Sequence, residues 1–297
     1  MAIEPTSASL RGRLSERALR ALDDQGVTRD TSLSCEPEVL RATLTRYGLP
    51  AYPAVLDLER LAGGVTLGGA VILGACAALR QFDGSPHLKR EDFFQVEGRP
   101  LVPVDGSVMP SLWMDEDGAI FRGYRGRWGG DPDPDSDDLV PAYESLTKLF
   151  ERYVLDIEAC WPPHSPKHEP RFEVSVQAPL GERFAELIGA KDDALASDRY
   201  GHIWLKEDAS IAEMVAAPLV DTRARLAALD DVVACLVAAA QEAPGRWVRW
   251  GKPILPEPRA GEEPIHRLAQ YDSWGKQTHW LLIYGGPGDY RFETAPV

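Results

Sequence analysis

The chain has 297 residues, of which 44% are hydrophobic and 26% are charged, so it is long enough for two domains and apolar enough to fill their cores. Its formal net charge of −14 at pH 7 disfavours binding to nucleic acid or to an anionic membrane and favours basic partners. Residues 1–160 contain 26 acidic and 17 basic side chains, so the acidity is concentrated in the first half.

The cysteines indicate a reducing compartment. The four of them form no CxxC pair, and the first residues lack the charged and then apolar pattern of a signal peptide. We therefore expect free thiols and a cytoplasmic protein. Residues 61–79 carry no charge but include five glycines, which favours a buried strand near 71–73 over a membrane span.

Helices are expected first along the chain. Apolar residues spaced by four predict an amphipathic helix over 8–25. A second helix is predicted over 36–47 with its end at Gly48, and a third over 53–62 with its end at Gly63 and Gly64, because glycine commonly terminates helices.

Strands and a long helix are expected next. The proline-punctuated residues 100–104 predict an edge strand. Residues 112–122 predict a β-hairpin, because Asp117-Gly118 suits a tight turn between apolar stretches. After an acidic loop, the spacing of apolar residues over 139–157 predicts an amphipathic helix, with Asp137 or Asp138 at its cap.

The second half opens with a change in composition. Four prolines within 161–170 predict an extended linker. Beyond it, periodicity predicts the following elements: a strand over 172–176, a helix over 182–188, a strand over 202–205, a helix over 222–240 and a closing hairpin over 280–292.

These elements predict a division of the chain into four parts. They are an N-terminal helical arm (1–35), a first α+β domain (36–160), the proline-rich linker (161–170) and a second α+β domain (171–297). Residues 112–120 resemble residues 203–211, and each stretch precedes a long apolar helix. The second domain is therefore either a divergent repeat of the first or an unrelated domain with a chance similarity.

Sequence motifs of catalysis and of cofactor binding are missing. The chain has no Walker loop, GxSxG, HExxH or CxxC pair, and its glycines do not fit GxGxxG. His164 and His168 lie in the proline-rich segment, which makes a poor zinc site. The aspartates at 131, 133 and 135 resemble the start of a calcium loop, but Ser136 and Ala142 replace its glycine and glutamate. We therefore expect no catalytic residue, no metal and no cofactor.

Acidic loops are the candidate binding surface. Trp128 lies among glycines and arginines beside the acidic loop, a composition typical of an interface anchor, with packing against the body as the alternative. The candidate partner-binding residues are Asp115, Glu116, Asp117, Trp128, Asp131, Asp133, Asp135 and Asp137.

The order of elements over 36–158 resembles the SUKH superfamily, which includes fungal cell-wall-synthesis regulators and bacterial immunity proteins of polymorphic toxin systems. The resemblance rests on Tyr47-Gly48-Leu49-Pro50, on Leu58 to Gly64, and on a final helix opened by Leu139-Val140-Pro141 and carrying Tyr143, Leu146 and Phe150. Ala62 stands where the family usually has asparagine. The resemblance implies an α+β fold with a twisted, mostly antiparallel sheet, helices packed on one side, and no catalysis.

Three functions compete at this point. The first, which the resemblance implies, is an immunity protein that binds and neutralises a basic toxin domain, such as a nuclease or deaminase, through an acidic surface that mimics phosphates. The second is a regulatory or scaffold module that binds proteins. The third is an enzyme with its site in 171–297, which predicts a closed pocket with a histidine or carboxylate of perturbed pKa.

Overall fold

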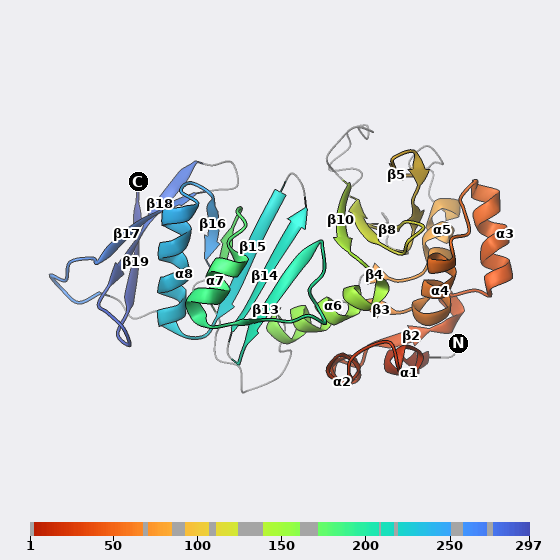
Figure 1. The fold of residues 1–297 in the computed structure, drawn as a ribbon, viewed down its shortest axis with the longest axis horizontal. Helices are drawn as coiled ribbons and strands as arrows, with labels where there is room; N and C mark the ends of the chain where they lie inside the picture. The colour runs from red at the N-terminus through yellow and green to blue at the C-terminus, as the bar shows by residue number, and fades with distance from the viewer. Residues whose placement is uncertain are drawn as a thin grey trace. The chain divides into compact units, whose positions relative to one another are not determined.

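The computed structural model describes residues 3–67, 71–84, 93–106, 111–123, 139–160, 172–207, 209–216, 219–250, 258–271 and 276–297. The chain divides into two compact units, Met1–Glu158 and Ala159–Val297. Both units combine helices with antiparallel strands, which confirms the predicted α+β class (Figure 1). No helix in the described ranges is long and apolar enough to cross a membrane. The predicted linker 161–170 lies outside the described residues.

The first unit consists of many short elements. In chain order they are β1 (Ile3–Pro5), α1 (Thr6–Leu10), α2 (Glu16–Asp24), β2 (Thr28–Asp30), η1 (Thr31–Leu33), α3 (Pro37–Tyr47), α4 (Pro53–Ala62), β3 (Thr66–Leu67), β4 (Val71–Ile72), α5 (Ala75–Gly84), β5 (Gln95–Val96), β6 (Arg99–Pro100), β7 (Val102–Pro103), β8 (Leu112–Met114), β9 (Ile120–Gly123), β10 (Leu139–Tyr143) and α6 (Leu146–Cys160).

A four-stranded antiparallel sheet in the order β10-β9-β8-β7 lies in this unit. Strands β8 and β9 form the predicted hairpin. Trp113 on β8 is 2% exposed and meets Phe93 and Phe94 edge-on, with ring centroids 6.2 and 4.9 Å away. Such edge-to-face contacts suit the charge distribution of aromatic rings, so this cluster anchors the sheet in the core.

The helices α3 and α4 confirm two predictions. Helix α3 ends at Gly48, whose φ of 72° places it in the left-handed region, and α4 ends where Gly63 begins the glycine pair. Near residues 71–73, only the two-residue strand β4 forms, and it pairs with β3. The helix α5 that follows it was not predicted, because the glycine-rich run before it has no helical period.

Two predicted helices are wrong in extent. The expected helix over 8–25 breaks at 11–15, where Ser15 caps α2 by accepting a hydrogen bond from the N–H of Ala18. Residues 139–143 form strand β10 rather than the start of a helix, so the Leu139-Val140-Pro141 opening of the predicted final helix is a strand. Pairing with β9 overrides the helical spacing of the apolar residues in this segment. Pro141, which lacks an N–H, is tolerated because β10 is the edge strand of the sheet.

The N-terminal residues belong to the first unit and are bound to it by specific contacts. The main-chain N–H of Ser15 donates to the buried Glu151 carboxylate of α6 at 2.7 Å, and its hydroxyl donates to the same group at 2.9 Å. Arg29 donates from Nε to the carbonyl of Gly63 at 2.8 Å. Both contacts place 3–35 against helices from later in the chain.

The second unit has longer strands. Its elements are β11 (Phe172–Val176), α7 (Gly181–Ile188), β12 (Lys191–Asp192), β13 (Gly201–Lys206), β14 (Ala209–Ala216), β15 (Leu219–Leu226), α8 (Leu229–Glu242), β16 (Trp247–Trp250), β17 (His266–Tyr271), β18 (Gln277–Tyr284) and β19 (Arg291–Pro296). A six-stranded antiparallel sheet runs in the order β12-β13-β14-β15-β11-β16, and a three-stranded sheet runs in the order β17-β18-β19.

One apolar cluster joins most of these elements. Side chains of α7 and α8 pack with those of β11, β14 and β15 and with Leu268, Leu281, Ile283 and Phe292 of the smaller sheet. The strand over 172–176, the helix over 182–188 and the closing hairpin are confirmed. The helix expected over 222–240 is wrong at its start, because 219–226 is strand β15, which pairs with β14 on one side and β11 on the other.

Candidate functional site

The candidate site is built around the tip of the β8–β9 hairpin, residues 115–118. Asp115 Oδ1 accepts hydrogen bonds from the N–H of Asp117 at 3.0 Å and of Ala119 at 2.8 Å. Gly118 has a φ of 88°, which favours glycine over any residue with a Cβ. Asp115 therefore organises the turn, and its carboxylate is already used by the fold.

The other two acids of the tip are exposed, and they differ in their partners. Glu116 forms an ion pair with Arg99, and both side chains are open to solvent. Asp117 is also exposed, and no side chain of the described residues donates a hydrogen bond to its carboxylate or forms an ion pair with it. Of the three predicted acids, Asp117 is thus the one whose charge is available to a partner.

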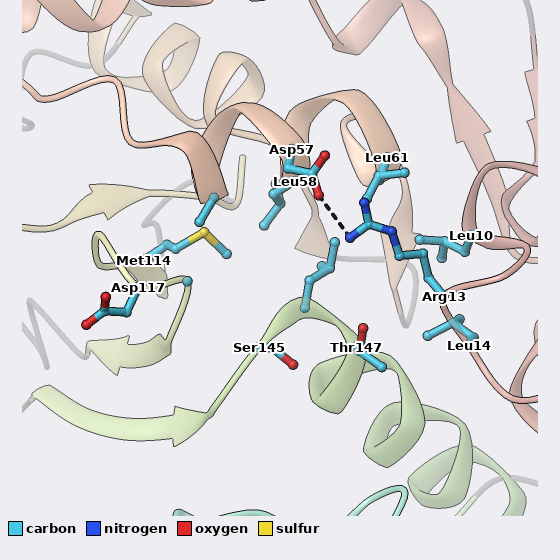
Figure 2. A pocket seen from close by; sticks show the side chains of 13 residues that line it. Leu10, Arg13, Leu14, Asp57, Leu58, Leu61, Met114, Asp117, Ser145 and Thr147 are labelled. Atoms are coloured by element: carbon cyan, nitrogen blue, oxygen red, sulfur yellow. Dashed lines mark ion pairs between the residues drawn. The ribbon is translucent and has the colours of Figure 1, made fainter.

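A pocket of about 160 Å³ adjoins Asp117 (Figure 2). Met114 and Asp117 line it from the hairpin, and the N-terminal segment lines the opposite side. Helix α4 and the start of α6 complete the wall. The apolar lining residues are Leu10, Leu14, Ala54, Leu58, Leu61, Met114 and Leu146, and the others are Arg13, Asp57, Asp117, Gly118, Ser145 and Thr147.

Charged groups at the pocket are arranged as one pair and one free acid. Arg13 Nη1 lies 3.1 Å from Asp57 Oδ2, and Asp57 also pairs with Arg60 on the next turn of α4. Because Arg13 and Asp57 are both partly exposed, this pair is screened by solvent and contributes little to stability. Asp117 has no such partner among the described residues.

The pocket combines leucines with charged groups. A depression of this size can hold one large side chain, and the carboxylate of Asp117 can attract a lysine or arginine beside that side chain. Ser145 Oγ accepts a hydrogen bond from the N–H of Lys148 at 3.3 Å, so this hydroxyl caps α6. The pocket lining holds no histidine or cysteine.

The structure brings together only part of the predicted site. Asp115, Glu116 and Asp117 share the hairpin tip, whereas Trp128, Asp131, Asp133, Asp135 and Asp137 lie outside the described residues. Sequence reasoning missed Arg13, Asp57 and the leucines of the pocket, because they come from segments that meet only in the folded chain. The sole signal in the sequence was the apolar face of each helix, which indicates core equally well.

One cluster in the second unit bears on the enzyme alternative. Ser197 Oγ donates to Asp192 Oδ1 at 2.7 Å, and Nδ1 of the exposed His202 lies 3.9 Å from the same carboxylate oxygen. A serine nucleophile has to donate its proton to a base such as histidine, with the carboxylate behind that histidine. Here the serine donates to the carboxylate itself, so the three side chains do not form a nucleophile and base pair.

Comparison with known proteins adds no relative. No protein-family model matches the chain, and no curated protein and no solved structure matches it either. The resemblance of 36–158 to the SUKH superfamily therefore remains a prediction from the sequence.

Proposed function

We propose that this chain is a protein-binding module that acts in the cytoplasm as an immunity protein, holding a basic toxin domain through the hairpin tip and the adjoining pocket. The proposal rests on the position of Asp117. Its carboxylate is exposed, has no partner among the described residues and lies at the edge of a leucine-lined pocket.

The physical argument combines charge and shape. A net charge of −14 attracts a basic protein, because complementary electrostatic potentials raise the association rate. Fully buried apolar anchors then supply most of the binding energy of a protein interface. Here, one apolar side chain of the partner enters the pocket while a basic neighbour pairs with Asp117.

The chain would neutralise the toxin by covering the basic cleft in which the toxin binds its substrate. A nuclease or deaminase toxin binds the phosphates of its substrate with lysines and arginines, and an acidic surface seated on those residues excludes the substrate. The SUKH resemblance of 36–158 supports this choice over a regulatory or scaffold module, for which the same geometry predicts binding without inhibition.

The test starts from capture of the partner by the tagged full-length chain in a lysate of its source cells. The captured protein is then expressed and purified, and its affinity for the chain is measured over a salt series. We expect a basic partner that arrests growth when expressed alone and is neutralised by co-expression of the chain. Asp117→Lys should weaken binding at least about 10-fold, because it places like charges together at the interface.

The matched control is Glu207→Lys, which reverses the charge of an exposed residue at the turn of the β13–β14 hairpin in the second unit. It should leave the affinity unchanged. Equal affinity of Asp117→Lys and the wild type would remove the hairpin tip from the interface. A partner that binds but does not arrest growth would support the regulatory module instead.

A further inference from the structure

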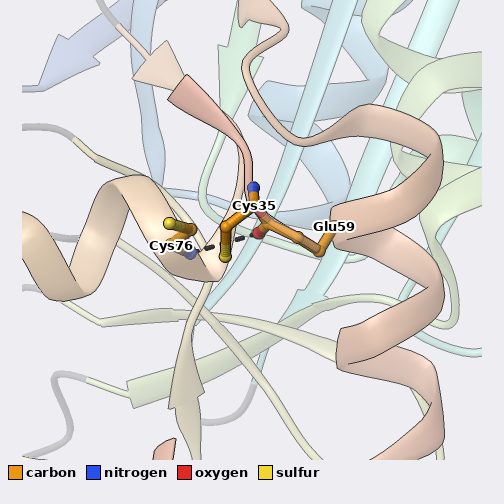
Figure 3. Close-up of side chains that lie close together, drawn as sticks. All are labelled: Cys35, Glu59 and Cys76. Atoms are coloured by element: carbon orange, nitrogen blue, oxygen red, sulfur yellow. Dashed lines mark hydrogen bonds between the residues drawn. The ribbon is translucent and has the colours of Figure 1, made fainter. Parts of the chain in front are cut away.

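Three side chains that can bind a metal ion meet inside the first unit (Figure 3). Cys35 lies just before α3, Glu59 lies in α4, and Cys76 is the second residue of α5. The two sulfur atoms and a carboxylate oxygen all lie within 4.8 Å of one another. Glu59 is 1% exposed and Cys76 is 7% exposed, whereas Cys35 is half-buried, so solvent reaches the cluster beside Cys35.

The carboxylate is held in place by main-chain groups. Glu59 Oε1 accepts a hydrogen bond from the N–H of Cys35 at 3.2 Å, and Oε2 accepts one from the N–H of Cys76 at 3.1 Å. The second of these donors belongs to the first turn of α5, where main-chain N–H groups lack partners within the helix. The N–H of Ala75 is a third main-chain donor to this carboxylate. A carboxylate has about four lone-pair sites, so one is left for a bond to a metal ion.

Glycines leave room around the same carboxylate. A Cβ at Gly63 would lie 2.8 Å from Glu59 Oε1, and a Cβ at Gly74 would lie 3.1 Å from Oε2. Any larger residue at either position would press on the buried group. Gly63, which follows α4, and Gly74, which precedes α5, thus form part of the wall of this cluster.

We propose that Cys35, Glu59 and Cys76 bind a thiophilic divalent cation of the zinc class, with solvent at the fourth position. Two thiolates and a carboxylate are a donor set that zinc accepts, with bonds of about 2.3 Å to sulfur and 2.0–2.2 Å to oxygen. In a tetrahedral site these bonds set the ligand atoms about 3.6–3.8 Å apart, so the cluster has to close by about 1 Å or less.

Burial and a hydrogen bond with Cys76 raise the pKa of the Cys35 thiol, so the cation has to displace protons that the metal-free site holds. Binding of one Zn²⁺ forms two Zn–S bonds and one Zn–O bond, and the two thiols release their protons to solvent. Two thiolates, one carboxylate and the cation leave a net charge of −1. Two guanidinium groups lie close by, because Arg29 donates to the carbonyls of Gly63 and Glu59 and Arg80 Nη1 donates to the carbonyl of Ser32 at 3.2 Å.

A bound ion would link the segment before α3 to α4 and α5, and α4 also contributes Asp57, Leu58 and Leu61 to the pocket described above. Loss of the ion would loosen one wall of that pocket. The inference concerns the ion site alone and stands whether or not the pocket binds a toxin.

Cobalt(II) is the probe for this site, because its thiolate complexes absorb by charge transfer from sulfur. The reduced full-length chain is freed of metal with a chelator and titrated with Co²⁺, and Zn²⁺ is then added to displace it. We expect a charge-transfer band that saturates at one Co²⁺ per chain and disappears with Zn²⁺. Cys35→Ala and Cys76→Ala should each weaken Co²⁺ binding more than about 10-fold, since even outer-shell changes cost that much.

The matched control is Cys235→Ala, which removes a buried free thiol from the second unit and should leave the band unchanged. A second measurement uses the wild-type chain alone, so its result does not depend on whether the variants fold. Zn²⁺ should protect the half-buried Cys35 from iodoacetamide, as read by mass spectrometry of the labelled peptides.

Three outcomes would overturn the proposal. One is a reduced wild-type chain that shows neither the band nor the protection. Another is a band that persists in both Cys35→Ala and Cys76→Ala. The third is a reduced chain that binds no Co²⁺ but forms a Cys35–Cys76 disulfide with a small disulfide oxidant, which would assign the pair to redox chemistry.

Discussion

The two units bury their polar groups in different ways. In the first unit the carboxylates of Glu59, Asp105 and Glu151 are at most 1% exposed, and each accepts hydrogen bonds from main-chain N–H groups. In the second unit, long antiparallel ladders satisfy the main chain of the sheet and one apolar cluster fills the interior, while the N–H groups of Leu180 and Gly181 donate to the side chains of Thr222 and Glu213.

This difference follows from the length of the strands. Short elements leave many main-chain N–H groups without a ladder partner, and a buried N–H without an acceptor is costly. Asp105 illustrates the solution, since its Oδ2 accepts from the N–H of Ser111 at 2.7 Å and thereby supports the start of β8. Both units have apolar cores. We infer that single buried acids contribute more to the stability of the first unit than to that of the second.

The largest effect is expected from truncation of the apolar core of the second unit. Phe184 on α7 is 0% exposed, and Phe184→Ala should lower the free energy of unfolding of this unit by about 4 kcal/mol, through lost burial and a residual cavity. Hydrogen exchange read by mass spectrometry gives the protection of peptides from each unit separately.

Leu187→Ala on the same helix is the control, because this leucine is 38% exposed and its truncation should change stability by less than about 0.5 kcal/mol. Equal loss of protection in both units for Phe184→Ala would show that their cores are not separate.

A somewhat smaller effect is expected from loss of a buried acid in the first unit. Glu59→Ala leaves the N–H groups of Cys35 and Cys76 without their acceptor and should cost about 3 kcal/mol, localised to peptides of the first unit. Exchange should be measured with a chelator present, so that only the hydrogen bonds contribute.

Glu38→Ala is the control for this change, because the Glu38 side chain on α3 is 81% exposed. Unaltered protection near α4 and α5 in Glu59→Ala would show that water replaces the carboxylate without loss, and would contradict the contrast between the units.

The parts of the fold that could be predicted are those set by neighbouring residues. Gly48 marks the end of α3, Gly63 marks the end of α4, and Asp117-Gly118 marks the turn of the β8–β9 hairpin, each through a local conformational preference. The break of the predicted helix at 11–15 is local, with Ser15 as the cap of α2. The other wrong predictions lie where strand pairing decides. Residues 139–143 and 219–226 have partly helical periods, yet both are strands.

The same distinction applies to the candidate sites. Asp117 was predicted from the composition of a single turn, but the pocket beside it needs three segments to converge. The Cys35–Glu59–Cys76 cluster is harder still, because its members lie 24 and 17 residues apart and follow no ligand-spacing motif. Patterns such as histidine pairs and calcium loops do not reveal a site that only tertiary structure assembles.

The smallest effect is expected within the hairpin tip, where two neighbouring acids have different roles. Asp115→Ala removes the acceptor for the N–H groups of Asp117 and Ala119 and should cost about 1 kcal/mol, seen as faster exchange in peptides that cover 112–123. Asp117→Ala should leave exchange in these peptides unchanged, because its carboxylate supports no contact among the described residues. If Asp117→Ala weakens partner binding while Asp115→Ala acts mainly on exchange, then Asp115 stabilises the turn and Asp117 contributes to binding. If both variants accelerate exchange equally, Asp117 also holds the turn, and its availability to a partner would have to be abandoned.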